Sequence, residues 1–408
     1  MQSVGSVFKV GHGPSSSHSV GPYSAAKFIR KYYPDADNRK VYLRGSLGMT
    51  AMGHGTVKAI KDILPDAEVI LDVTTPESEL PHPNTMDFIG YKNGQEVSNI
   101  RIMSIGGGRL SIVDHPNKEA IDIYPQKNFA EIAAYCADNN INLAEFVYKY
   151  EGDQIKDKLA SRWRTMQEAV ERGLNKDGIL PGGLNLERKA GILFNNISHN
   201  EAAETTQARL ISAFAFAVAE ENASESVVVT APTCGSCGVI PSIFYYMKNY
   251  KGFTDDEIID ALAVAGLFGN IIRTNASISG AEAGCQAEIG SACSMAAAGL
   301  AHLYKLSIRQ IEYAAEVAME HFLGLTCDPI CGLVQIPCIE RNAVGALRAV
   351  NSVNLARFLY STRTVSFDDV IATMLQTGKD MDEKYKETSH GGLAELYKKD
   401  DRDRFISS

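Results

Sequence analysis

The runs ALAVAGLFGN (residues 261–270) and SACSMAAAGLAHLYKL (residues 291–306) decide how the second half of this 408-residue chain folds. Both are long enough for helices, and both are rich in Ala, Gly and Ser, whose small side chains let helices approach closely. Apolar residues also recur at helical intervals from residue 128 to residue 174. These patterns predict a mostly α-helical second half, interrupted by one short strand-like run, SVVVT, at residues 226–230.

The first part of the chain has a mixed pattern. PESELPHPN (residues 76–84) contains three prolines and is predicted to be a loop. The predicted elements around it are helices over residues 23–32 and 55–63 and strands over residues 39–46, 67–73 and 97–105. We therefore predict an α+β protein with a mixed α/β domain over residues 1–125 and a helical domain over residues 126–408.

The composition is that of a soluble globular protein, with 45% hydrophobic and 22% charged residues. The net charge of -9 argues against a general nucleic-acid binder, which would show a basic face. The most apolar stretch, Ala261–Phe268, is much shorter than the roughly 18–20 residues that cross a bilayer. Since the N-terminus also has no secretory signal pattern, we expect a cytoplasmic protein without a nucleic-acid or membrane partner.

The eight cysteines are too sparse for a disulfide framework, so their positions carry the information. TCDPICGLVQIPC contains Cys327, Cys331 and Cys338, and SISGAEAGCQAEIG contains Cys285. A proline beside Cys338 and another close to Cys327 predict non-helical segments, in which thiolates can converge on an iron–sulfur cluster. The pattern C-x3-C-x6-C differs from the paired C-x2–4-C of zinc fingers. The alternative is a set of buried free thiols.

A second cysteine pattern, C-x-x-C, is formed by Cys234 and Cys237 in TAPTCGSCG. This pattern suits zinc or dithiol chemistry, and a helix N-terminus after it would lower a thiol pKa. The same run has the Gly, Ser and Thr content of a strand-to-helix turn whose backbone N–H groups hold an anion. We favour the anion-holding turn, with the two thiols incidental.

Two loops carry further candidate groups. GHGPSSSHSVGP offers Ser15, Ser16, Ser17 and His18, either as donors to a small anionic ligand or as an N-cap for the helix that follows. His54 and His82 also stand among Gly or Pro, where a core histidine is less natural, although a lone histidine is more often structural. YKETSHGGLAEL places Lys386 before a Gly-Gly hinge, and helix capping is its alternative role.

Together these segments resemble the iron–sulfur-dependent L-serine dehydratases (L-serine ammonia-lyases). The matching segments are GPSSSHSVGP, HPNTM, TAPTCGSCGVIP, NASISGAEAGCQAEIG, LTCDPICGLVQIPCIERN and YKETSHGGLA, which extend from residue 13 to about residue 395. The resemblance implies a β-type N-terminal part fused to an α-type helical part. It also implies a lyase that converts L-serine to pyruvate and ammonia in amino-acid catabolism and gluconeogenesis, and it suggests a homodimer.

The resemblance further implies a [4Fe-4S] cluster bound by Cys285, Cys327 and Cys338, with one iron left open as a Lewis acid. The base that removes the substrate's α-proton remains open at this point, with His18 and His54 as the first candidates and Lys386 as the third. The candidates for holding the substrate's carboxylate and ammonium are Ser15, Ser16, Ser17, Asn275, Ser277 and Ser279.

The chain departs from many family members in its tail, because no cysteine follows Cys338 to reach the open iron. We expect water, hydroxide or Cys331 to fill that position, and we expect truncation after about residue 396 to have little effect. Two other functions remain open. The same cluster chemistry could act on another β-substituted amino acid, such as threonine or cysteine, or the chain could be a non-enzymatic iron–sulfur or zinc sensor.

Overall fold

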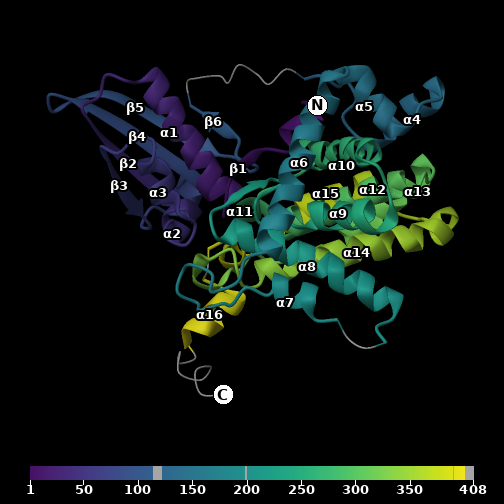
Figure 1. Cartoon of the computed structure of the whole chain (residues 1–408). Helices are drawn as coiled ribbons and strands as arrows, with labels where there is room; N and C mark the ends of the chain where they lie inside the picture. Colours follow the sequence, from purple (N-terminus) through teal and green to yellow (C-terminus); the bar gives the residue numbers. More distant parts are fainter. Residues whose placement is uncertain (114–121, 198–199, 389, 400–408) are drawn as a thin grey trace.

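The computed structural model describes residues 1–113, 122–197, 200–388 and 390–399. A mixed α/β part lies to one side of a larger assembly of helices, which confirms the predicted α+β class (Figure 1). The strands are β1 (Val10–His12), β2 (Asn38–Gly45), β3 (Ala67–Asp72), β4 (Asn84–Lys92), β5 (Gln95–Ser104), β6 (Leu110–Ile112) and β7 (Val227–Val229).

The helices that accompany the sheet are α1 (Gly21–Tyr32), α2 (Ser46–Thr50) and α3 (Thr56–Lys61). The helical part comprises α4 (Phe129–Asn139), α5 (Leu143–Glu151), α6 (Gln154–Leu174), α7 (Ala190–Asn195), α8 (Ala203–Ala223), α9 (Val239–Lys251), α10 (Asp255–Asn275), α11 (Gly280–Ala283), α12 (Ser291–Leu303), α13 (Ile308–Glu320), α14 (Cys338–Leu359), α15 (Phe367–Asp380) and α16 (Gly392–Lys399). Short 3-10 or π turns are η1 (Val4–Ser6), η2 (Ser16–Val20), η3 (Glu77–Glu79), η4 (Gln286–Gly290), η5 (Ile330–Gly332), η6 (Tyr360–Thr362) and η7 (Glu383–Tyr385).

The α/β part is built on a five-stranded sheet with the order β3-β2-β4-β5-β6. β2 and β3 are parallel, and the other neighbouring pairs are antiparallel. Sequence patterns predicted β2, β3 and β5 but not β4, whose first residue, Asn84, had been assigned to a loop. β4 lies in the middle of the sheet and is buried on both faces over most of its length, so it lacks the polar–apolar alternation that reveals a strand.

The N-terminal segment lies with the helices, although the sequence placed all of residues 1–125 in the α/β domain. β1 pairs antiparallel with β7, and Val10 is opposite Val229. The apolar side chains before β1 also pack into the core of the helical part, and these are Met1, Val4, Val7 and Phe8. The chain therefore leaves the helical part at Gly13-Pro14, forms the sheet, and returns by Tyr124, so the loop after β1 lies where the two parts meet.

The helix α12 is the centre of the helical part, as its small-residue sequence predicts. All of its residues are buried, and it packs against α10, α13 and α14. Gly299 allows the closest approach, because a Cβ there would lie 2.7 Å from the Ala261 carbonyl oxygen of α10. A helix that is apolar on every side belongs in the interior of a large domain. No helix among the described residues combines the length and apolar content that a membrane span requires.

This close approach gives a first stability prediction. Gly299→Ala should lower the free energy of unfolding by about 1–3 kcal/mol, because its new methyl group meets a backbone atom that cannot move aside. Gly345→Ala in α14 is the matched control, since its methyl group would meet the side chains of Ile289 and Val239 instead. The control should stay within about 1 kcal/mol of wild type, because alanine is the better helix former. Equal losses from both substitutions in denaturant titrations would contradict this packing.

Candidate active site

Three buried cysteines from separate segments converge on one cavity. Cys285 precedes η4, Cys327 lies in the loop after α13, and Cys338 is the first residue of α14 rather than part of the predicted non-helical segment. Their exposed fractions are 3%, 4% and 8%, respectively. We call this space the cysteine cavity, and it is lined by Pro14, Ser15, His54, Gly235, Cys285, Glu288, Cys327, Pro329, Val334, Cys338 and Glu387.

The charges around these thiols favour a thiolate. A hydrogen bond from Cys327, together with the nearby Arg341 guanidinium, lowers the pKa of Cys285 to about 6. Arg341 is fixed in place, since it donates to the Thr326 carbonyl over 2.8 Å and to Asp328 Oδ1 over 3.2 Å. The buried Cys285–Cys327 pair therefore carries one negative charge beside a fixed positive charge. Soft thiolate donors in such a setting fit an iron–sulfur cluster better than a hard cation.

Glu288 is a fourth polar group at the cysteine cavity. A donor atom from each of Cys285, Glu288 and Cys327 lies within 4.8 Å of the other two. Burial and the neighbouring Cys285 raise the pKa of Glu288 to about 8. Gly280 makes room for this group, because a Cβ there would lie 2.9 Å from the Glu288 carboxylate and 3.2 Å from Cys327 Sγ.

The serine-rich loop enters the cavity from the α/β side. Ser15 Oγ accepts from the His18 N–H over 3.1 Å, so this serine caps the short turn η2. The predicted cap of the helix near Tyr23 is not formed, because α1 has no side-chain cap. Ser17 Oγ donates to His18 Nδ1 over 2.8 Å. Ser15 also lines the cysteine cavity, whereas Ser16 and Ser17 are buried and do not line it. The loop thus combines capping with a place at the cavity.

His18 and His54 lie side by side, with ring centroids 4.5 Å apart. Both are fully buried, and burial lowers the pKa of His54 to about 3 and that of His18 well below its usual value. Glu387 joins them, with its Oε1 3.4 Å from His18 Nδ1 and 3.9 Å from His54 Nε2. Burial also raises the pKa of Glu387. Two neutral imidazoles therefore face one carboxyl group.

The hydrogen bonds assign the tautomer of His54. Thr50 Oγ1 donates its proton to the Ser46 carbonyl over 2.9 Å, so its lone pair accepts from His54 Nδ1–H over 2.9 Å. The proton of the neutral ring is therefore on Nδ1, and Nε2 carries a lone pair. Among the described residues, neither His54 Nε2 nor Glu387 Oε2 has a hydrogen-bond partner. Buried polar atoms without partners are the groups expected to meet a ligand.

The same reasoning gives His18 the other tautomer. Ser46 Oγ donates to the Glu387 carbonyl over 2.8 Å and therefore accepts from His18 Nε2–H over 3.0 Å. Both nitrogens of His18 are thus engaged, while His54 keeps one free. The Glu387 N–H in turn donates to the Cys327 carbonyl over 2.8 Å. Glu387 therefore connects a cysteine loop of the helical part to both histidines of the α/β part.

The remaining predicted residues are placed away from the cavity lining. The exposed Asn275 donates to the Lys127 and Ile271 carbonyls, and Lys386 is half-buried beside Cys327. Ser277 Oγ donates to the Glu282 carboxylate, which also contacts His82 Nε2 over 3.0 Å. Ser279 is buried next to Gly280, and its Oγ has no partner within the described ranges.

The other cysteines do not line the cysteine cavity. Cys234 and Cys237 precede α9, but burial raises the pKa of Cys234 to about 12 and also raises that of Cys237, contrary to the lowering that a helix N-terminus would produce. Cys331 is exposed. Buried thiols with raised pKa values are unreactive. The charged tail from residue 400 onward lies outside the described residues.

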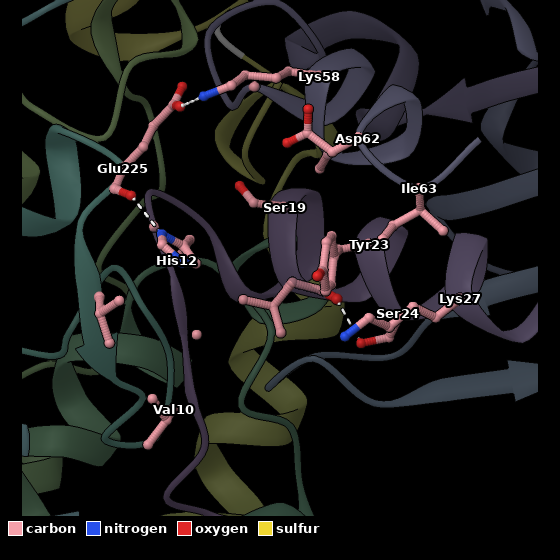
Figure 2. A pocket seen from close by; sticks show the side chains of 16 residues that line it. Val10, His12, Ser19, Tyr23, Ser24, Lys27, Lys58, Asp62, Ile63 and Glu225 are labelled. Atoms are coloured by element: carbon pink, nitrogen blue, oxygen red, sulfur yellow. Dashed lines mark hydrogen bonds and ion pairs between the residues drawn. The ribbon is translucent and has the colours of Figure 1, made fainter. Parts of the chain in front are cut away.

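A second cavity, of about 600 Å³, lies on the other side of η2 between β1, α1 and α3. Figure 2 shows Lys58 paired with the carboxylate of Glu225, and His12 reaching the Glu225 carbonyl over 2.9 Å. None of the residues that line this cavity is a cysteine or a predicted site residue. The cysteines and the predicted site residues that line a cavity are therefore at the cysteine cavity.

Sequence reasoning missed Glu288, Arg341, Thr50 and Ser46, and it assigned no role to Glu387, which follows Lys386 in YKETSHGGLAEL. Glu288 and Arg341 stand inside the two cysteine segments, three residues after Cys285 and Cys338, respectively. Their positions in the sequence indicated that both residues lie near the cysteines, but not what either residue does. Thr50 and Ser46 lie in an unremarkable Gly-rich run, and only the folded structure brings them to the histidines.

Two family models match the chain. The one described as serine dehydratase beta chain matches residues 3–65, and the one described as serine dehydratase alpha chain matches residues 70–394. L-serine dehydratase 2 of Escherichia coli (strain K12) is 39% identical, and the alignment covers 97% of this chain and 98% of that protein. L-serine dehydratase of Haemophilus influenzae is 39% identical, and the alignment covers 97% of this chain and 99% of that protein. L-serine dehydratase of Helicobacter pylori is 38% identical, and the alignment covers 97% of this chain and 99% of that protein.

Proposed function

The chain belongs to the serine dehydratase family, a family of lyases, and on that premise we propose that it eliminates water from L-serine to give pyruvate and ammonia. We further propose that Cys285, Cys327 and Cys338 hold a [4Fe-4S] cluster. The observation that supports this most strongly is a single cavity lined by three buried cysteines and by two unpartnered acid–base atoms, His54 Nε2 and Glu387 Oε2.

The three thiols fit such a cluster in number, chemistry and charge. Cysteine thiolates are the usual ligands of [4Fe-4S] clusters, and the negative charge of Cys285 is already stabilised beside Arg341. When bound, the cluster supplies Lewis acidity from an iron that three thiolates leave open, which makes hydroxide a better leaving group. Glu288, within 4.8 Å of Cys285 and Cys327, is placed to hold a proton near the leaving group.

His54 is the proposed base. His54 lines the cavity, its Nε2 has no partner among the described residues, and Thr50 fixes the ring by accepting from Nδ1–H. When Nε2 takes the α-proton of serine, the imidazolium lies 3.9 Å from Glu387 Oε1, whose lone pairs can stabilise the new positive charge. His18 holds Glu387 in place through Ser46. Loss of the α-proton and hydroxide gives 2-aminoacrylate, which takes up water after release and becomes pyruvate and ammonia.

Ser15 is the proposed contact for the substrate's carboxylate or ammonium. It is the one of the three predicted loop serines that lines the cavity. Ser16, Ser17, Ser277 and Ser279 then support the walls of the site, and Asn275 and Lys386 stay outside it. Ser15→Ala should raise the KM for L-serine about tenfold with a smaller change in kcat, because one hydrogen bond to a charged group is lost. An unchanged KM in steady-state kinetics would remove Ser15 from the site.

The proposed function is tested on one anaerobic preparation of the full chain. Iron and sulfide should be present in a ratio near one, and the protein should form pyruvate from L-serine. Activity on L-threonine or L-cysteine that exceeds activity on L-serine would assign the chemistry to another amino acid. A cluster-loaded protein that converts none of the three would contradict an enzymatic role.

A further inference from the structure

Three segments that each carry a cationic side chain pack together where the N-terminal segment, the α/β part and α10 come together. Lys9 is fixed beside β7, because its N–H donates to Thr230 Oγ1 over 2.9 Å and its carbonyl accepts from the Thr230 N–H over 2.8 Å. Arg273 lies in the last turn of α10 and is 7% exposed. Arg109 follows a glycine turn of the α/β part and acts electrostatically on both Lys9 and Arg273.

The glycine turn explains how Arg109 reaches the other two. Gly106, Gly107 and Gly108 all have positive φ angles, of 81°, 57° and 67°. A Cβ on Gly107 would lie 3.0 Å from the Ile278 side chain and 3.6 Å from the Pro232 carbonyl. Ile278 follows closely after Arg273, and Pro232 follows closely after Thr230. The turn therefore packs between the two segments that carry the other cations.

These cations have no anionic partner in the part of the chain that the structure describes. None of the three lies within 4.0 Å of a carboxylate oxygen there. Arg273 donates only to neutral groups, Ser6 Oγ over 2.8 Å and Asn270 Oδ1. Arg109 makes one long contact, 3.4 Å to the Ile105 carbonyl, and its buried Nε is unpartnered.

The carboxylate that acts electrostatically on Arg109, that of Glu282, already has other hydrogen-bond partners. It accepts from Ser277 Oγ and lies 3.0 Å from His82 Nε2. Burial and the two arginines lower the pKa of Lys9 to about 8, and burial followed by Arg109 lowers that of Arg273 to about 9. Arg273 is buried, whereas Lys9 and Arg109 are half-buried. Proteins keep buried charges paired, because unpaired ones cost desolvation and repulsion. A buried donor without a partner indicates an ion or water at that place.

We propose that Lys9, Arg109 and Arg273 bind a small oxyanion with two or more negative charges, such as a phosphoryl group or a dicarboxylate. The planar guanidinium donors match the oxygens of such ligands, and the lysine adds a point charge. The ligand would neutralise charges from three parts of the chain at once and so hold them together. None of the three residues lines the cysteine cavity.

The test is calorimetric titration of the anaerobically purified full chain in phosphate-free buffer at constant ionic strength. The probes are inorganic phosphate and malonate. One saturable site per chain is expected for at least one probe, and the tighter of the two identifies the preferred chemistry. Arg109→Gln and Lys9→Gln should each weaken binding tenfold or more, because each removes a charged hydrogen-bond donor. Arg164→Gln, at an exposed arginine of α6, should bind as wild type does.

Three outcomes would overturn the site. The first is no saturable binding of either probe to the wild type. The second is an affinity in Arg109→Gln and Lys9→Gln that equals that of the wild type. The third is an equal loss of affinity in Arg164→Gln, which would show general attraction to a basic surface. Each of these leaves the proposed dehydration of L-serine untouched, because pyruvate formation is measured separately.

Discussion

Replacing any one of Cys285, Cys327 and Cys338 with alanine should remove the cluster and reduce pyruvate formation to background. The wild type should contain about four iron atoms per chain, and each variant far fewer, because two remaining thiolates cannot hold a [4Fe-4S] cluster firmly. The loss should be equal for the three positions, since all three side chains are buried at one cavity. Iron, sulfide and pyruvate are measured on the same anaerobic sample.

Cys234→Ala and Cys237→Ala are the matched controls. Both thiols are buried within the same part of the chain, but neither lines the cysteine cavity. Their raised pKa values show that burial keeps them protonated. Both variants should keep their iron and at least half of the wild-type activity. Loss of iron from Cys234→Ala, with the protein still folded by circular dichroism, would place the ligand set elsewhere.

The second large effect is expected at His54. His54→Gln should lower kcat by about 10²–10⁴ while iron and sulfide stay at wild-type levels, because a positioned base is lost but no thiol is. His12→Gln is the control, since His12 lies at the second cavity and contacts the Glu225 carbonyl. An activity in His54→Gln within threefold of the wild type would assign proton removal to another group.

The orientation of His54 can be tested apart from its basicity. Thr50→Val removes the acceptor for His54 Nδ1–H, so the ring can place its proton on Nε2 instead. We expect kcat to fall about tenfold or more with little change in KM, and Thr50→Ser should restore it, because serine keeps the hydroxyl. A purely structural role for Thr50 would lower the thermal midpoint and leave kcat of the folded protein unchanged.

The fold was predictable where one pattern dominated a long segment. The small-residue runs that became α10 and α12 predicted close helix packing, and Gly299 against Ala261 shows that packing. β4 could not be recognised, because a strand buried on both faces has no alternation. The pairing of β1 with β7 was equally hidden, since each strand has three residues and they are far apart in the sequence.

The candidate site was predictable as a set of residues but not as an arrangement. The motifs named the three cysteines, and the structure brings them together with His54 and Ser15. The separate roles of His18 and His54 depend on which nitrogen carries the proton. Ser46 and Thr50 decide that, and no sequence pattern links them to the histidines. The role of Glu387 could likewise be recognised only from the folded structure, in which a loop near residue 387 contacts His18 and His54.

The central claim is that Cys285, Cys327 and Cys338 would hold a cluster with one open iron at which L-serine would bind, and that His54 is the base. Mössbauer spectroscopy of ⁵⁷Fe-loaded His54→Gln protein tests it most directly, because this variant should bind L-serine without consuming it. Three thiolates account for three of the four irons of a [4Fe-4S] cluster. We predict that adding L-serine shifts the signal of one iron site in four and leaves the other three unchanged. A spectrum with no site altered by saturating L-serine would contradict the account.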